Sequence, residues 1–526
     1  MEKNNCTEGA PEAKRRRCRI ISDHFYDPDF QKEIFSSWNT DNPIKNERLE
    51  IITKPFKVCK ISNFLNDTDF LDQIKASLLD VKSTRQDIDL FKMEQTSDLS
   101  KEKNENIKKL YSAFQNDVAD WIEKNTAIHL NKKITMTGSC YNDTDYLICH
   151  DDRLTDRRIA FILYLSKDWS AEFGGTLDLF DTDEQGLPKN IVHSIVPEYN
   201  SLVFFEVTNN SYHQVSEILK PKARCSINGW FHGSVADRAE FKRPEEIVSF
   251  MDPEMTECDL SSWVSKMYLD PQTICDIQEE VENDSSALLK DFISDAMYKK
   301  LSEEIQGNSI KWKMVGPPDV RRYEVADEDS LPENLASFIK LIKSVTFCQY
   351  LKNLTELDLV PETDEMKPKL NFELQRWSHG CYTLLKDEKS EEKNDSLEDS
   401  NNVIEIESNE NISSDEDGDG EIITADNIDQ YLSDSDHEEP GTSGEYEEES
   451  EKGVLEVILQ FHTENFKSQS IAYVDKTEED GTIMEIPYKD NHLSLVYITG
   501  TSQRLQKYMN HTVEGYTYCL ICAYIE

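Results

Sequence analysis

Two histidines and an aspartate in the first half of the chain have the types and spacing of a metal site. His150 and Asp152 stand at the end of a predicted strand, and His213 follows Asp152 by 61 residues. Side chains two positions apart on a strand point the same way, so we expect both to reach one ion while Asp151 points elsewhere. Two imidazoles and one carboxylate on one face form the facial triad of non-haem Fe(II) oxygenases. Such a triad leaves three coordination positions open, enough for a 2-oxo acid and dioxygen.

An arginine 11 residues after His213 could anchor the 2-oxo acid. Arg224 begins a predicted strand, and a guanidinium binds a carboxylate through two parallel hydrogen bonds. Arg224 therefore suits the buried carboxylate of 2-oxoglutarate. Tyr141 and Tyr164 lie on neighbouring predicted strands and could add hydroxyl donors.

Each of these residues also has a purely structural interpretation. The histidines could be one surface residue and one core residue, Arg224 could form a surface ion pair, and the tyrosines could simply pack in a core. The pair Gly174-Gly175 is interpreted as a turn without direct chemistry. The joint spacing of the histidines, the aspartate and the arginine favours the metal site.

The elements that must position these residues are short strands. Eight of them within about 100 residues favour a double-sheet jelly roll or barrel. A further strand at 56–64 and helices at 67–79 and 105–123 come before them, and we expect the helices to pack on one face. The eight predicted strands are Ile134–Cys140, Tyr146–His150, Arg158–Leu165, Gly175–Phe180, Ile191–Ile195, Ser201–Glu206, Gln214–Glu217 and Arg224–His232.

The second half repeats the order of elements of the first. Its predicted helices are Ala287–Ile305 and Leu335–Leu351, and strands resume at Val454–Phe461. We therefore predict an α+β fold, mainly β, of two tandem double-stranded β-helix (jelly-roll) domains with flanking helices. The matching segments are Phe64–Asp67 with Phe292–Asp295, Tyr146–Asp151 with Tyr382–Asp387, Ser201–Phe204 with Ser494–Tyr497, and Arg224–Ile227 with Tyr518–Ile521.

The second copy is predicted to be degenerate and catalytically inactive. Lys386 stands in the place of His150, no histidine occurs around 504–506, and Tyr518 replaces Arg224. The alternative is a misaligned repeat, with another cluster such as His379 and Cys381 binding a metal.

Composition shifts along the chain set the domain boundaries. The predicted organisation is a disordered basic tail at 1–22, a catalytic Fe(II)/2-oxoglutarate dioxygenase domain at 23–236, a linker at 237–257 and a non-catalytic jelly-roll domain at 258–526. A disordered acidic insert at 388–452 interrupts the last domain. Residues 387–452 hold 26 Asp or Glu and 3 Lys. A segment with this composition cannot bury enough apolar surface to offset the chain entropy that folding removes.

The charge of the 526-residue chain bounds its partners. Its 57 Lys and Arg against 103 Asp and Glu give a formal net charge of −46. This charge repels nucleic acid and anionic membranes and favours basic proteins, so neither direct nucleic-acid binding nor a membrane is expected. The sequence leaves the oligomeric state open.

The expected location is the nucleus and cytoplasm. The chain lacks a signal-peptide pattern and a run of roughly 20 apolar residues. The 12 cysteines are scattered, as is typical of free thiols in a reducing compartment, and Cys519 and Cys522 are predicted to be buried strand residues rather than a zinc pair. The cluster Lys14–Arg17 fits either a nuclear import signal or a solvated tail.

Several motifs resemble the eukaryotic "2-oxoglutarate and iron-dependent oxygenase domain-containing" ribosomal prolyl hydroxylases. The resemblance covers nearly the whole chain and is strongest over 133–234. It is carried by Arg158–Leu165, Gly174–Leu177, Leu202–Phe205, His213–Ser216 and Ser226–Gly233.

The resemblance implies both fold and reaction. The family has a catalytic jelly roll followed by a degenerate one, and it 3-hydroxylates a proline of a small-subunit ribosomal protein at the decoding centre, which affects translation termination and fidelity. It implies Fe(II), 2-oxoglutarate and dioxygen, with ascorbate as reductant. On its pattern His150, Asp152 and His213 bind iron, and Arg224, Tyr141 and Tyr164 contact 2-oxoglutarate.

Two other functions stay open at this point. One is an oxygenase that acts on a different protein side chain or on a nucleobase. The other is a non-enzymatic acidic scaffold for basic partners. The exact proline, the stereochemistry and the number of hydroxyl groups added are not fixed by the sequence.

Overall fold

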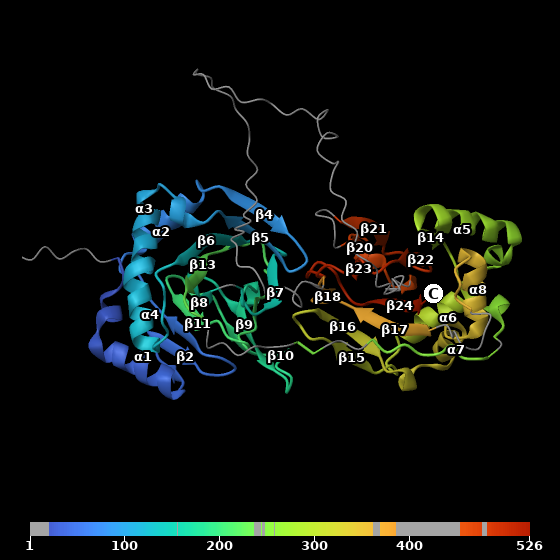
Figure 1. Ribbon diagram of the computed structural model, residues 1–526, viewed down its shortest axis with the longest axis horizontal. Coiled ribbons are helices and arrows are strands. Elements are labelled where there is room, and N and C mark those ends of the chain that lie inside the picture. The colour runs from blue at the N-terminus through green and yellow to red at the C-terminus, as the bar shows by residue number, and fades with distance from the viewer. Residues whose placement is uncertain are drawn as a thin grey trace, which may run out of the picture. The chain divides into compact units, whose positions relative to one another are not determined.

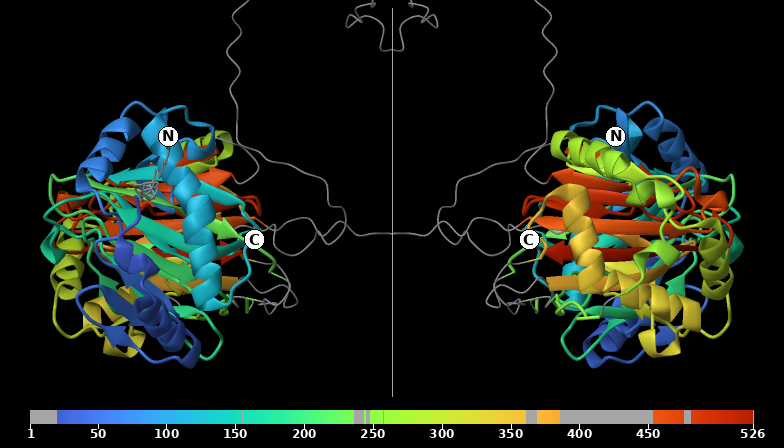
Figure 2. Two further views of the ribbon diagram at one scale, coloured as in Figure 1. Left: turned by 90° about the vertical axis from the view of Figure 1, so that its left-hand side faces the viewer. Right: turned by 90° about the vertical axis from the view of Figure 1, so that its right-hand side faces the viewer.

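The computed structural model describes residues 20–154, 156–235, 243–244, 248–256, 258–360, 369–385, 453–475 and 481–525. Within these ranges the chain forms two antiparallel β domains, each with helices packed on one face of its sheet (Figures 1 and 2). The predicted acidic insert, the cluster Lys14–Arg17 and Lys386 lie outside the described residues. The described chain begins before Asp23, because Ile21 is buried and bridges to Leu65.

The first domain is a curved sheet whose strands follow the order β1-β2-β3-β11-β8-β13-β6-β5-β7-β12-β9-β10, with β4 attached to β5. Its helices are α1 (Pro28–Thr40), α2 (Thr68–Leu78), α3 (Glu105–Ala113) and α4 (Ala119–Thr126). Its strands are β1 (Ile44–Lys45), β2 (Leu49–Ile52), β3 (Val58–Ile61), β4 (Ser83–Asp87), β5 (Phe91–Thr96), β6 (Ile134–Tyr141), β7 (Tyr146–His150), β8 (Arg157–Tyr164), β9 (Leu177–Thr182), β10 (Pro188–Ile195), β11 (Leu202–Glu206), β12 (His213–Val215) and β13 (Arg224–His232).

Alternation along the central strands separates two buried layers. On β8, Ile159 and Phe161 join the core under the helices, whereas Ala160 and Tyr164 face the domain interior. The helices supply the matching apolar face, as α3 does with Ile107 and Leu110. The interior side of the sheet is therefore left to hold the polar site residues.

The expected helix at 105–123 is interrupted. A π-helical turn, Phe114–Val118, separates α3 from α4. The wider turn shifts the helical register so that both Phe114 and Val118 are fully buried. The expected strand at 56–64 is shorter, and the polar hairpin β4–β5 has no apolar alternation that would reveal it in the sequence.

The second domain has an eight-stranded sheet in the order β14-β22-β19-β24-β17-β16-β15, with β18 on β16, and a three-stranded sheet β21-β20-β23. Its helices are α5 (Pro271–Asp284), α6 (Asp295–Ile305), α7 (Glu333–Ile342) and α8 (Val345–Thr355). Its strands are β14 (Ser286–Leu289), β15 (Trp312–Val315), β16 (Arg321–Ala326), β17 (Lys369–Trp377), β18 (Tyr382–Thr383), β19 (Val454–Phe461), β20 (Ser470–Asp475), β21 (Thr482–Pro487), β22 (Leu493–Ile498), β23 (Ser502–Leu505) and β24 (Thr517–Ile525).

Two helix predictions in this half were wrong in part. The segment expected to start a helix at Ala287 begins as strand β14, because pairing with β22 overrides the helix propensity of Ala-Leu-Leu. The expected helix at 335–351 is two helices, since Ser344 caps a new one by accepting a hydrogen bond from Phe347 N–H at 3.3 Å.

The two domains share one unusual hydrogen-bonding motif, which confirms the repeat. Asn200 has φ of 61°, and its side chain accepts from Leu65 N–H and donates to Leu65 C=O. Asn491 has φ of 54° and makes the same two bonds with Ile293. This equivalence corrects the predicted alignment of the two repeats, because the residue that corresponds to Leu202 is Leu493 rather than Leu495.

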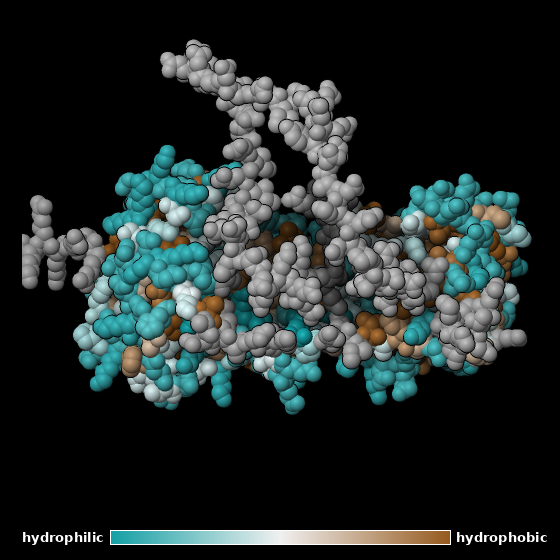
Figure 3. All heavy atoms as spheres, in the orientation of Figure 1, coloured by the Kyte–Doolittle hydropathy of each residue, from teal (hydrophilic) through white to brown (hydrophobic). Residues whose placement is uncertain are grey.

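The ten cysteines of the described residues are free thiols, and the prediction that Cys519 and Cys522 are buried strand residues is confirmed. Cys519 and Cys522 are completely buried on β24, and they belong to two different core clusters. No helix of the described residues is both long and apolar enough to cross a membrane. The face of the described chain in Figure 3 is mostly hydrophilic, with separate apolar patches.

Candidate iron and cosubstrate site

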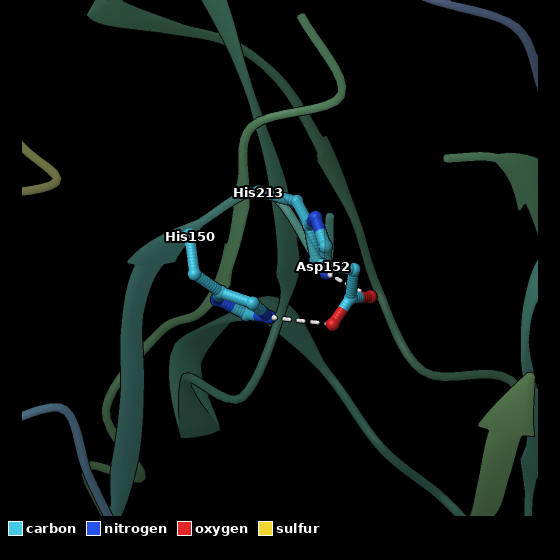
Figure 4. Close-up of side chains that lie close together, drawn as sticks. All are labelled: His150, Asp152 and His213. Atoms are coloured by element: carbon cyan, nitrogen blue, oxygen red, sulfur yellow. Dashed lines mark ion pairs between the residues drawn. The ribbon is translucent and has the colours of Figure 1, made fainter. Parts of the chain in front are cut away.

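His150, Asp152 and His213 converge in the first domain. The two histidines are direct cross-strand partners on β7 and β12, with ring centroids 4.2 Å apart. Their Nε2 atoms lie 3.6 Å and 3.5 Å from the two carboxylate oxygens of Asp152, as the dashed lines in Figure 4 mark. Within the described residues this is the only cluster of three or more possible ligands spaced for one metal ion. An ion with bonds of about 2.0–2.2 Å to nitrogen and oxygen fits between them.

Backbone carbonyls fix the orientation of both imidazoles. Nδ1 of His150 donates to the carbonyl of Ile148, and Nδ1 of His213 donates to that of Ser211, each at 2.8 Å. This assigns the proton to Nδ1 and leaves the Nε2 lone pair directed at the cluster. Burial, followed by the charge of His150, lowers the pKa of His213 to about 4, so its ring is neutral at physiological pH. A neutral imidazole is the form that binds metal.

Asp152 reaches the cluster by a different route from the one predicted. Strand β7 ends at His150, and Asp152 lies in a left-handed turn with φ of 62°. The side-chain alternation of a strand therefore does not explain its position, although Asp tolerates this conformation better than most residues. Asp151 does point elsewhere, because its carboxylate accepts two hydrogen bonds from Arg153, at 3.0 Å and 2.5 Å.

Arg157 supports the Asp152 carboxylate and was missed by the sequence reasoning. Its guanidinium carbon lies 3.6 Å from the ring centre of Trp230, and Nη1 is 3.7 Å from Asp152 Oδ1. Burial alone would raise the pKa of Asp152, but His150, His213 and Arg157 outweigh it, and the net shift is downward. Asp152 is thus held as a carboxylate.

Arg224 lies at the start of β13, only 1% exposed, opposite Tyr141 on β6. Its guanidinium carbon is 5.1 Å from the ring centres of both Tyr141 and Tyr164. Burial raises the pKa of Tyr141 to about 12 and also raises that of Tyr164, so both hydroxyls remain donors. The three side chains predicted to meet are therefore adjacent.

Two buried polar atoms in this group lack a protein partner among the described residues. They are Arg224 Nη2 and Tyr164 Oη. Burying such donors unpaired is costly, which fits a site that binds a carboxylate. Phe205 packs in one cluster with Tyr164 and lies 4.7 Å from the His213 ring, so the arginine group and the metal cluster share one interior. The residues fit 2-oxoglutarate.

Gly175 has a role that the turn interpretation missed. Its carbonyl accepts a hydrogen bond from Arg224 Nε at 2.8 Å. An added Cβ would stand 2.8 Å from Arg224 Cδ and 2.7 Å from Ile218 Cδ1, at a φ of +66°. Glycine is required here because the arginine side chain passes against the backbone. The adjacent glycines before a strand were the only signal.

The second domain has no equivalent cluster among its described residues. Thr517, rather than the predicted Tyr518, occupies the place of Arg224, because Thr517 pairs with Trp377 as Arg224 pairs with Tyr141 at the ends of their strands. On β23, the partly buried Arg504 donates to Glu456 at 2.8 Å. This ion pair links β23 to β19.

Comparisons with known proteins agree with this geometry. A family described as "2OG-Fe(II) oxygenase superfamily" matches residues 136–232, and one described as "Oxoglutarate and iron-dependent oxygenase degradation C-term" matches residues 256–525. The prolyl 3-hydroxylase OGFOD1 of Mus musculus is 37% identical over 362 residues, covering 68% of this chain and 66% of that protein.

Two further relatives and one solved structure are also similar to this chain. The Xenopus laevis OGFOD1 is 35% identical, covering 63% of this chain and 70% of that protein. Prolyl 3-hydroxylase sudestada1 of Drosophila melanogaster is 29% identical, covering 71% and 73%. A Pseudomonas putida prolyl-4-hydroxylase structure covers 33% of this chain and 91% of its own, with 19% identity and a TM-score of 0.29. The chain belongs to the family of 2-oxoglutarate- and iron-dependent prolyl 3-hydroxylases that includes OGFOD1 and sudestada1.

Proposed function

We propose that this chain 3-hydroxylates a proline of a basic small-subunit ribosomal protein at the decoding centre, and so affects translation termination and fidelity. The observation that carries the proposal is the cluster His150–Asp152–His213, which shares one interior with the unpartnered donors of Arg224 and Tyr164. The relatives called prolyl 3-hydroxylases support the reaction. The net charge of −46 supports a basic protein as substrate. The proposed location of the reaction is the nucleus and cytoplasm.

In this proposal the three clustered side chains hold Fe(II), with ascorbate as its external reductant. Iron bound there would activate dioxygen and couple decarboxylation of 2-oxoglutarate to succinate with insertion of oxygen into the prolyl ring. The carbonyls of Ile148 and Ser211 keep both Nε2 atoms turned inward. Arg157 keeps the Asp152 carboxylate in place.

Arg224 binds the far carboxylate of 2-oxoglutarate. Its Nε is already used by Gly175, so Nη2 and the Tyr164 hydroxyl are the free donors. The tyrosine rings and the surrounding apolar residues exclude water, which strengthens this charge-assisted contact.

The test uses the full-length protein with Fe(II), 2-oxoglutarate, ascorbate and a proline-containing peptide from a decoding-centre ribosomal protein. We expect succinate release together with one added oxygen atom on the proline, seen by mass spectrometry. Asp152→Ala should lose both signals. Asp151→Ala is the matched control and should keep them, because its carboxylate pairs with Arg153. Oxygen added to RNA but not to the peptide would contradict the proposed substrate.

A further inference from the structure

A second cavity lies in the first domain, on the helix side of β6 and β13. It has a volume of about 760 Å³, with Cys140 and Cys225 among its lining residues. Leu78 of α2 lies over β6, since a Cβ added at Gly138 would stand 3.2 Å from Leu78 Cδ2. None of these residues takes part in the proposed reaction.

Cys140 and Cys225 face each other directly across the two strands. The N–H of Cys225 donates to Ser166 Oγ at 2.8 Å, and its carbonyl accepts from Leu165 N–H at 3.0 Å, so both groups point away from β6. Cys140 and Cys225 are therefore a non-hydrogen-bonded antiparallel pair, a geometry in which the two Cα atoms are typically about 4.5 Å apart. That separation lies within the range of about 4.4–6.8 Å seen in disulfides.

Both thiols are free and partly exposed, and their surroundings make them unequal. A hydrogen bond from the Cys140 thiol, followed by the charge of Lys75, lowers the pKa of Cys225 despite burial. The same hydrogen bond raises the pKa of Cys140. Glu94 opposes the shift at Cys225 but does not reverse it. The pair thus offers one nucleophilic thiolate beside one thiol that can resolve it.

We propose that Cys140 and Cys225 form a peroxide-reactive dithiol site whose disulfide weakens 2-oxoglutarate binding at Arg224. The Cys225 thiolate attacks one oxygen of hydrogen peroxide, the O–O bond breaks, and a sulfenic acid and hydroxide form. The hydroxide takes up a proton to give water. Cys140 sulfur then attacks the sulfenic sulfur, the S–S bond forms, and the second water leaves with the Cys140 proton. The two thiols are oxidised by two electrons, and one peroxide is reduced to two waters.

The link to the cosubstrate follows from the strands. Tyr141 and Arg224 directly adjoin the two cysteines and are themselves opposite each other, with side chains on the other face of the same sheet. Arg224 has little freedom, because it passes against Gly175. A separation of about 4.5 Å is shorter than the usual disulfide separation of about 5.5–6 Å, so the S–S bond favours a wider spacing of the two strands at the cysteines, and this moves the arginine. This second part rests on the proposed position of 2-oxoglutarate.

The first experiment measures the disulfide. Reduced full-length protein, freed of metal by a chelator, is treated with stoichiometric hydrogen peroxide, blocked with N-ethylmaleimide and digested for mass spectrometry. We expect a Cys140–Cys225 cross-linked peptide that a phosphine reductant removes. Cys140→Ser should instead trap a sulfenic acid on Cys225, detected with dimedone. Cys275→Ser, which removes an exposed thiol on α5, should cross-link like the wild type.

The second experiment measures coupling. Oxidised wild type should show an apparent KM for 2-oxoglutarate raised about three- to tenfold, because small displacements of a binding group are costly. Reduction should restore it, and the peroxide-treated double variant Cys140→Ser/Cys225→Ser should keep the reduced value.

Each outcome decides one part. Absence of the cross-link, or oxidation of Cys275 at the same rate as Cys225, overturns the dithiol site. A cross-link with an unchanged KM overturns the coupling. If the reduced enzyme does not consume 2-oxoglutarate, the proposed function fails, while the cross-link yield still decides the dithiol site.

Discussion

Replacing Gly175 by alanine should selectively damage cosubstrate binding. The new Cβ would lie 2.8 Å from Arg224 Cδ and 2.7 Å from Ile218 Cδ1. The left-handed φ of +66° adds about 1–2 kcal/mol of backbone strain for a residue with a Cβ. Moving Arg224 also breaks its 2.8 Å bond to the Gly175 carbonyl, and a hydrogen bond to a charged group is worth about 1.5–3 kcal/mol.

If the loss of this Arg224 hydrogen bond weakens 2-oxoglutarate binding by the same free energy, the apparent KM for 2-oxoglutarate should rise about 10- to 100-fold. The strain should also lower the free energy of unfolding by about 1–2 kcal/mol. Succinate release against 2-oxoglutarate concentration measures the first effect, and urea unfolding measures the second.

The matched control is Gly515→Ala. Gly515 has a φ of +79°, but a Cβ there would meet nothing within 4 Å. It should therefore carry the backbone strain without the change in KM. The same KM in both variants would refute the assignment of Arg224 as the cosubstrate anchor held by Gly175.

Three further predictions concern the same account. Arg224→Lys keeps the charge but loses the planar donor pair, so 2-oxoglutarate binding measured by calorimetry should weaken about tenfold or more with iron still bound; an unchanged affinity would remove Arg224 from the site. The pKa of His213 is lower in the folded protein than in the unfolded chain, so protonation favours unfolding. With a chelator present, the free energy of unfolding measured by urea titration should fall as the pH drops from about 6.5 to about 4, by up to roughly 1 kcal/mol per pH unit. His213→Gln should flatten this dependence on pH, and an equal slope in both proteins would contradict the lowered pKa. Deleting residues 390–450 should leave turnover of a short peptide unchanged in the succinate assay, and loss of that turnover would show that the segment is part of the catalytic fold.

Much of the site could be predicted from the sequence, because the residue types and their spacing along the chain are visible there. Strands β6, β7, β8 and β13 begin and end within one residue of their predicted bounds. His150 and Arg224 lie on two of them, and His213 begins β12. The structure brings these residues into one interior, together with Tyr141 and Tyr164 as expected.

The remainder depends on tertiary contacts that no local pattern reveals. Asp152 reaches the cluster through a left-handed turn. The role of Arg157 beside Asp152 becomes visible only in the folded chain, where its guanidinium stacks on Trp230. The carbonyl of Gly175 acts on an arginine 49 residues away. In the second domain, the register of β24 against β17 puts Thr517, one residue from the predicted Tyr518, in the place of Arg224.

Iron stoichiometry tests the central claim most directly. Full-length protein loaded anaerobically with Fe(II), then freed of excess metal, should hold one tightly bound iron per chain by elemental analysis. His150→Ala should lose it, Asp151→Ala should keep it, and neither variant should unfold by circular dichroism, because the ligands line an interior space rather than a packed core. Two irons per wild-type chain, or one that survives in folded His150→Ala, would contradict the assignment of His150, Asp152 and His213 as the metal centre.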